Sequence, residues 1–179
     1  MRDVSYRVAL GGIVASLCLI AMFLAGILPA FYLILPMIAG LLMMIIATEV
    51  STSWALLTYI AVGLLSLLIT ADKEAALIFI MLFGHYPILR FYLQKMHFKA
   101  VRFLIKIIIF NICVLSFFYI TVYIFGIREM IEQFDEFGKY GGLIMLSVCN
   151  IIFVLYDYNL GMFWYLYKKH LMPKFKRKK

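Results

Sequence analysis

The chain has 179 residues, of which 66% are hydrophobic and only 15% are charged, and its formal net charge is +8. A water-soluble domain is roughly 45–50% apolar and about 25% charged, so this composition excludes an ordinary soluble globular protein. The basic residues adjoin long apolar runs, where they serve as topology signals and contacts to anionic lipid rather than to nucleic acid.

Taken in chain order, the apolar runs predict an all-α, polytopic integral membrane protein with one domain over residues 1–179. At about 20 apolar residues per crossing, six transmembrane helices are expected, and a basic tail follows at 168–179. Pro29 ends the first helix, Ser51–Ser53 can cap the third, and Pro87 is expected to kink the fourth. The expected helices cover residues 4–28, 31–47, 53–69, 75–93, 101–127 and 140–167.

The first helix carries small residues four positions apart. Gly11 with Ala15, and Gly12 with Ser16, form this pattern. Small residues at such spacing allow another helix backbone to approach closely in lipid. The pattern predicts either packing against a neighbouring helix of the same chain or docking to a separate membrane protein.

The basic connector at residues 90–106 determines the predicted orientation. With six crossings and both termini in the cytoplasm, 14 of the 17 basic residues lie inside, as expected for a membrane protein. Spacings of four, three and four predict one basic stripe on a helix in the headgroup layer. The tail at 174–179 is expected to lie on the same anionic lipid, and the outer segment 128–139 is a candidate lid. The stripe comprises Lys95, Lys99, Arg102 and Lys106.

The last helix carries the clearest polar face. Ser147, Asn150, Asp157 and Gly161 share one side of it. Asp157 lies deep in the hydrocarbon, where an acid by default marks a substrate, ion or proton site. Tyr158, beside it, and Tyr123, near the end of the fifth helix, are further candidate ligand-binding groups. No lysine or arginine is expected at the depth of Asp157, and a structural hydrogen bond to another helix is the alternative reading.

Catalytic and metal-binding motifs are missing from the sequence. It has no phosphate-binding loop and no metalloprotease or serine-hydrolase motif, so we expect a protein that is not an enzyme and has no cofactor. Cys18, Cys113 and Cys149 lie singly inside apolar runs and are expected to be small core residues rather than metal ligands. His85, beside Pro87, is expected to satisfy backbone groups at the kink.

Six short helices in under 200 residues, with small residues on the first helix and prolines at 29 and 36, resemble the S components of energy-coupling factor transporters. That resemblance implies a substrate-binding subunit, in a bacterial cytoplasmic membrane, that captures a vitamin-like molecule from outside. It also implies a coupling subunit with ATPases as partner, contacted through the first helix.

Three functions therefore remain open. The first is a capture subunit that needs partners for energy. The second is a non-catalytic scaffold or assembly protein that binds partner helices and anionic lipid, in which Asp157 only holds the bundle together. The third is an independent transporter that uses a proton at Asp157. A cavity lined by Asn150 and Asp157 favours capture, and a solidly packed interior favours the scaffold.

Overall fold

A computed structural model of the chain describes residues 4–126 and 140–171, and every regular element in these ranges is helical. The candidate lid and the tail at 174–179 lie outside the described residues. The elements are α1 (Val4–Ile27), η1 (Pro29–Phe31), α2 (Ile34–Glu49), α3 (Thr52–Ile69), α4 (Lys73–Ile78), η2 (Phe79–Phe83), α5 (Tyr86–Leu93), α6 (Lys99–Tyr123), α8 (Gly141–Leu166) and η4 (Tyr167–Leu171).

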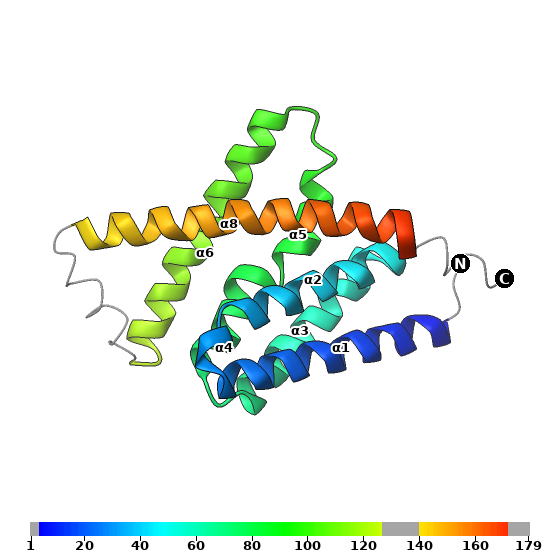
Figure 1. The fold of residues 1–179 in the computed structure, drawn as a ribbon, viewed down its shortest axis with the longest axis horizontal. Coiled ribbons are helices and arrows are strands. Elements are labelled where there is room, and N and C mark those ends of the chain that lie inside the picture. The colour runs from blue at the N-terminus through cyan, green and yellow to red at the C-terminus, as the bar shows by residue number, and fades with distance from the viewer. Residues whose placement is uncertain (1–3, 127–139, 172–179) are drawn as a thin grey trace.

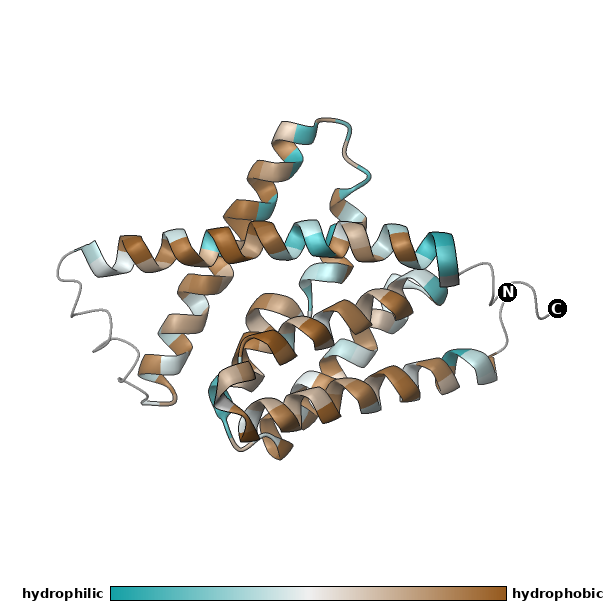
Figure 2. Ribbon diagram, viewed as in Figure 1, coloured by the Kyte–Doolittle hydropathy of each residue, from teal (hydrophilic) through white to brown (hydrophobic). Residues whose placement is uncertain are grey.

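The helices are those of an α-helical membrane protein. Five helical segments of the described residues are long and apolar enough to cross a membrane, whereas Ile34–Glu49 has only 16 residues. Most residues of the long helices are hydrophobic (Figure 2). Many large apolar side chains, such as Leu68 and Phe98, are exposed on the outside of the bundle. The start of α1 and the end of α8 lie at the same end of the bundle (Figure 1). The prediction of six crossings, with both termini cytoplasmic, remains a prediction.

Two apolar clusters hold the helices together. The first joins α1, α2, α3 and α4 around Cys18, Met22 and Met43. The second joins α2, η2, α5, α6 and α8 around Phe83, Tyr86 and Phe153, among others. The short connection after α1 places α1 and α2 side by side (Figure 1). In that view α6 crosses α8. Helix α2 contributes to both clusters and so connects α6 and α8 to the helices of the first cluster.

The fourth predicted helix is interrupted rather than bent smoothly. The segment passes from α4 into the π-helical η2, breaks at Gly84 and His85, and resumes as α5 with Pro87 in its first turn. Proline cannot donate its backbone hydrogen bond, which leaves the carbonyl of Phe83 without its helical partner. The hydroxyl of Tyr156, from α8, donates to that carbonyl over 3.2 Å. His85, which was expected to satisfy backbone groups at the kink, contacts the carbonyl of Ile80 in η2, at 3.3 Å from its Nδ1.

The interruption brings η2 against α2 at Gly40. A Cβ at this position would overlap the Tyr156 hydroxyl and lie 2.6 Å from the carbonyl oxygen of Phe83. The backbone atoms of η2 cannot move away as a flexible side chain would. Glycine at position 40 is therefore needed for α2, η2 and α8 to meet.

The ends of the helices differ from the predicted bounds by a few residues. The largest of these differences is at the end of α6, which lies at Tyr123 rather than near residue 127. Ser51 caps α3, because its hydroxyl accepts from the backbone N–H of Trp54 over 3.3 Å. Asp72 caps α4 by accepting from the N–H of Glu74 over 2.9 Å. Both caps satisfy donors that the first turn of a helix leaves unpaired.

The small residues of α1 separate into two faces. Gly11 and Ala15 are half-buried toward the bundle, and a Cβ on Gly11 would lie 3.8 Å from the Thr58 hydroxyl of α3. Gly12 and Ser16 are exposed, and a Cβ on Gly12 would meet nothing within 4 Å. One half of the predicted contact surface thus packs internally, and the other half faces outward.

Candidate functional site

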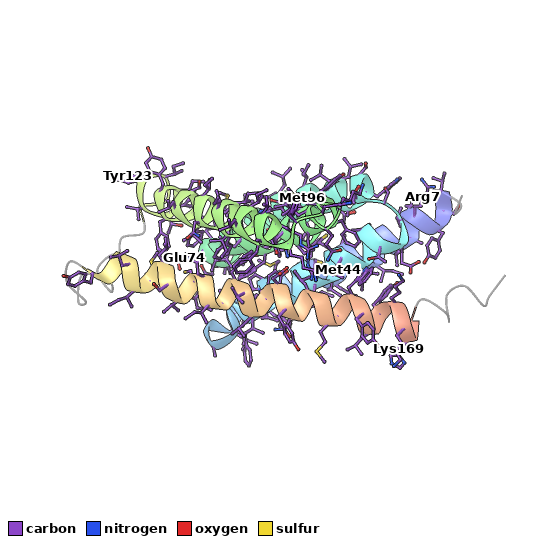
Figure 3. The ribbon with its side chains drawn as sticks, turned by 90° about the horizontal axis from the view of Figure 1, so that it is seen from above. Arg7, Met44, Glu74, Met96, Tyr123 and Lys169 are labelled. Atoms are coloured by element: carbon purple, nitrogen blue, oxygen red, sulfur yellow. The ribbon has the colours of Figure 1, made fainter. Side chains whose placement is uncertain are left out.

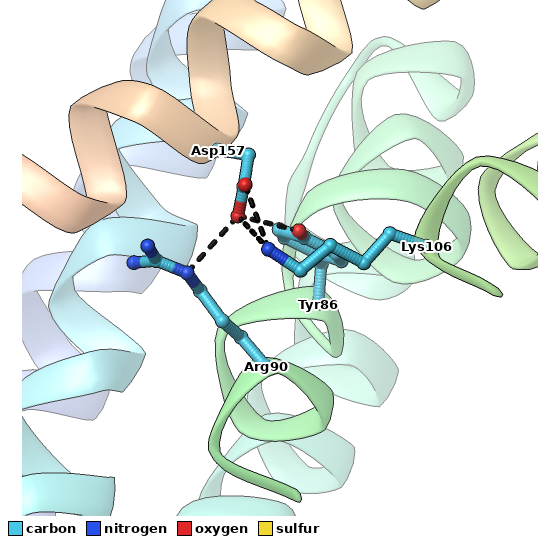
Figure 4. A network of polar contacts seen from close by, with 4 residues as sticks. All are labelled: Tyr86, Arg90, Lys106 and Asp157. Carbon is cyan, nitrogen blue, oxygen red and sulfur yellow. Dashed lines mark hydrogen bonds and ion pairs between the residues drawn. The ribbon is translucent and has the colours of Figure 1, made fainter. Parts of the chain in front are cut away.

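Asp157 of α8 lies at the centre of a charged cluster where α5, α6 and α8 meet (Figure 4). Lys106 of α6 donates to both carboxylate oxygens, over 2.8 and 2.7 Å. The Tyr86 hydroxyl of α5 donates to Oδ1 over 2.6 Å. Arg90, one turn further along α5, places its Nε 3.0 Å from the same oxygen. We call Tyr86, Arg90, Lys106 and Asp157 the charged cluster.

Local structure explains why these four side chains meet. Tyr86 and Arg90 are four residues apart, so they share a face of α5. The break at Gly84 and His85 sets the direction of α5, and the ring of Tyr86 packs edge-on against Phe153, one turn before Asp157 on α8. Phe153 also stacks on Phe110 of α6, with ring centroids 4.2 Å apart. Aromatic packing therefore holds the three helices in place around the charges.

The charged cluster is largely but not completely buried. The exposed fractions of the side chains are 7% for Lys106, 12% for Arg90 and 22% for Asp157. Asp157 lies nine residues before the end of α8 and 16 residues after its start, or about 14 and 24 Å along the helix axis. With the predicted orientation the cluster lies in the inner half of the membrane.

The expectation that no cation reaches Asp157 is wrong. Apolar runs flank residues 90–106, so the sequence predicts that Arg90 and Lys106 belong to a cytoplasmic connector. Helix periodicity predicts that Lys106 shares a stripe with Lys95, Lys99 and Arg102. In the structure α6 begins only at Lys99, so Lys95 lies outside the helix and four cations cannot share one helical stripe. Lys95 and Lys99 are exposed and Arg102 is half-buried, whereas Lys106 turns inward. The acid itself was the only signal that a buried cation had to be nearby.

Asn150 also pairs within the bundle. Its amide group exchanges two hydrogen bonds with Asn111 of α6, over 3.0 and 3.1 Å. Each Asn also donates to a carbonyl of its own helix, Asn111 to Ile107 and Asn150 to Leu146. The polar face predicted on α8 is therefore real from Asn150 to Gly161, and it packs against α6 and α5.

Three of the candidate ligand-binding residues lie apart from the charged cluster. Ser147 is exposed and donates to the carbonyl of Leu143 in its own helix. Tyr158 is 71% exposed and Tyr123 is 75% exposed. Tyr123 projects from the end of α6 (Figure 3). In a membrane-embedded bundle these side chains contact lipid or the headgroup layer, so the structure does not bring them together with Asp157.

Two of the grooves formed by the described residues open on the sides of the bundle, and neither of these two is lined by Asn150 or Asp157. One, of about 360 Å³, runs between α2 and α8 and is lined mainly by apolar side chains, with Tyr156 and Asn159 also in its lining. The other, of about 520 Å³, runs between α3 and α5, with Thr52, Tyr92 and His85 among its lining. Among residues 4–126 and 140–171, no three His, Cys, Asp or Glu side chains gather closely enough to hold a metal ion.

No family model, curated protein or solved structure matches this chain.

Proposed function

We propose that this chain is a membrane-embedded capture subunit, which binds a small molecule at the charged cluster and depends on partner subunits for energy. The observation that carries the proposal is the cluster itself, with three ionisable side chains and a tyrosine from three helices inside an apolar bundle. Charges at this depth are costly, and in membrane proteins they usually mark substrate or ion pathways.

The exposed part of Asp157 supports access to the cluster. A side chain that only holds helices together is best shielded from water, because water weakens an ion pair that it can reach. Asp157 retains 22% of its exposed area. In the predicted orientation the ligand would be held nearer the cytoplasmic side, which suits release into the cell more than first capture at the outer surface.

The outward face of α1 supports a partner subunit. Gly12 and Ser16 present backbone and small side chains to the membrane, and they leave room for another helix to approach. The resemblance to S components of energy-coupling factor transporters assigns the same helix to the coupling subunit. We place the protein in the bacterial cytoplasmic membrane on that resemblance.

Native mass spectrometry of the gently purified protein from its own host tests this proposal. We expect a retained small molecule and co-purifying transmembrane and ATPase subunits. Gly12→Leu should remove the partner subunits while leaving the fold intact, because nothing lies near that position. Gly142→Leu is the matched control, since Gly142 of α8 is equally open. Partner retention unchanged in Gly12→Leu would contradict docking through α1.

A scaffold or assembly protein is the second candidate. It is favoured by the amide pair and by the two grooves described above, neither of which is lined by Asn150 or Asp157. Asn111 and Asn150 bond each other rather than facing a cavity, and each carboxylate oxygen of Asp157 already accepts hydrogen bonds. Such a protein would co-purify with partners but retain no small molecule. The same mass spectrometry therefore separates the two functions.

A further inference from the structure

The charged cluster is not balanced in charge. Arg90 and Lys106 bring two positive charges, and Asp157 brings one negative charge. A neutral pair would be enough to hold helices together, and a second buried cation adds the cost of its desolvation. One cation of the cluster therefore has no counter-ion of its own in the described part of the chain.

Arg90 is the cation with fewer contacts to Asp157. Lys106 and Tyr86 make the hydrogen bonds to Asp157, whereas Arg90 only forms an ion pair with it. The Nε and Nη1 atoms of Arg90 are buried and have no hydrogen-bond partner among the described residues. A guanidinium group offers five N–H donors in a planar fork, which fits two oxygens of a carboxylate or phosphate at once.

Gly161 leaves space at the far end of this guanidinium. A Cβ on Gly161 would lie 2.9 Å from Nη2 of Arg90, so any larger residue would press against the group. The sequence placed Gly161 on the polar face of α8 together with Asp157. Its role in the structure is to let Arg90 reach across the helix surface beside the carboxylate.

We infer that Arg90 recognises an oxyanion, either a carboxylate or a phosphate, and that Asp157 occupies Arg90 when this ligand is absent. The oxyanion would be the ligand of the proposed capture subunit, so its role in the cell rests on the proposed function. Lys106 adds a second positive charge next to the ligand, while Tyr86 and Lys106 keep Asp157 in place. Because Asp157 and the ligand compete for one guanidinium, the two act in opposite directions on binding.

Because Asp157 and the oxyanion compete for Arg90, variants of Asp157 and Arg90 should change the oxyanion affinity in opposite directions. Asp157→Asn keeps an oxygen for Tyr86 and Lys106 but removes the competing charge, so oxyanion affinity should rise, by about tenfold or more. Arg90→Gln should lower the affinity by at least about tenfold, the factor that corresponds to about 1.4 kcal/mol. This variant leaves a neutral Lys106–Asp157 pair and is expected to fold. Gly161→Ala should also weaken binding, and Lys99→Gln, at an exposed cation, is the control without effect.

Equilibrium binding to the purified full-length protein in nanodiscs provides the measurement. In one arm, radiolabelled phosphate and radiolabelled benzoate are added to protein in phosphatidylcholine, and this arm detects a soluble ligand. In the other arm, retention of phosphatidylglycerol is measured, and this arm detects a lipid headgroup. Binding that depends on Arg90 in either arm supports the inference and identifies the source of the oxyanion.

Two outcomes would overturn the inference. The first is that no oxyanion binds to the wild type or to Asp157→Asn in an Arg90-dependent way in either arm. The second is that Asp157→Asn loses affinity while remaining folded. Neither outcome depends on partner subunits, so loss of co-purifying ATPases alone would refute the capture function and leave the binding site intact.

Discussion

Replacing Asp157 by leucine is the most direct perturbation of the charged cluster. It removes the acceptor for the hydroxyl of Tyr86 and the counter-ion for both cations. At an effective dielectric constant of about 20, contacts of 2.7 and 3.0 Å each correspond to about 6 kcal/mol of Coulomb attraction. Desolvation offsets much of this energy, and breaking a buried pair on one side costs about 3–5 kcal/mol net.

We therefore expect Asp157→Leu to lower the free energy of unfolding by about 3–5 kcal/mol. The double variant Asp157→Leu with Lys106→Met should recover part of this loss. It leaves only Arg90 charged, so one buried cation without a counter-ion remains instead of two. Reversible unfolding in mixed micelles, followed by Trp fluorescence, measures both variants. A loss below about 1 kcal/mol, or a double variant less stable than the single one, would refute the structural role of the ion pairs.

Three further predictions test the fold. Gly40→Ala should destabilise the protein by about 1–3 kcal/mol, because the Cβ would overlap η2 and Tyr156, whereas Gly142→Ala should be neutral in the same unfolding assay. Asn150→Leu should cost about 1–2 kcal/mol by breaking the reciprocal amide pair, and a stability equal to wild type would exclude a structural role. In a variant without native cysteines, Ala71→Cys should react with an impermeant reagent on intact cells and His97→Cys only after permeabilisation. The reverse pattern would invert the topology.

The helical architecture could be predicted from the sequence because lipid requires long apolar helices, and their length and composition are visible in one dimension. The polar face of α8 was also predictable, since Asn150 and Asp157 lie on one side of the helix. Their partners were not, because Arg90 and Lys106 adjoin a connector in which most cations face the headgroups. Which way a cation turns near a helix end depends on where that helix begins and crosses its neighbours, and this information lies in tertiary packing.

Three other features could not be predicted from the sequence, because they too depend on tertiary packing or on residue types with several common roles. Pro87 indicated a disturbance in the fourth helix, but the π-helical turn before it has no clear sequence pattern. The hydroxyl of Tyr156 satisfies the freed carbonyl from a helix that is more than 70 residues away in sequence. Tyr158 and Tyr123 were grouped with Asp157 because aromatic residues suit ligands, but aromatic residues are equally common at membrane interfaces.

The length of α2 has a consequence for the surrounding lipid. Its 16 residues span about 24 Å, whereas the hydrocarbon layer is about 30 Å thick. A helix that is too short for the bilayer is accommodated by local thinning, at a cost of fractions of a kcal/mol for each ångström of mismatch. If α2 crosses the membrane, the bilayer beside it is compressed, and lipids with shorter acyl chains should gather there. A change in membrane thickness would then shift α2 relative to α8. Such a shift would alter the groove between these helices and the position of Asp157 on α8.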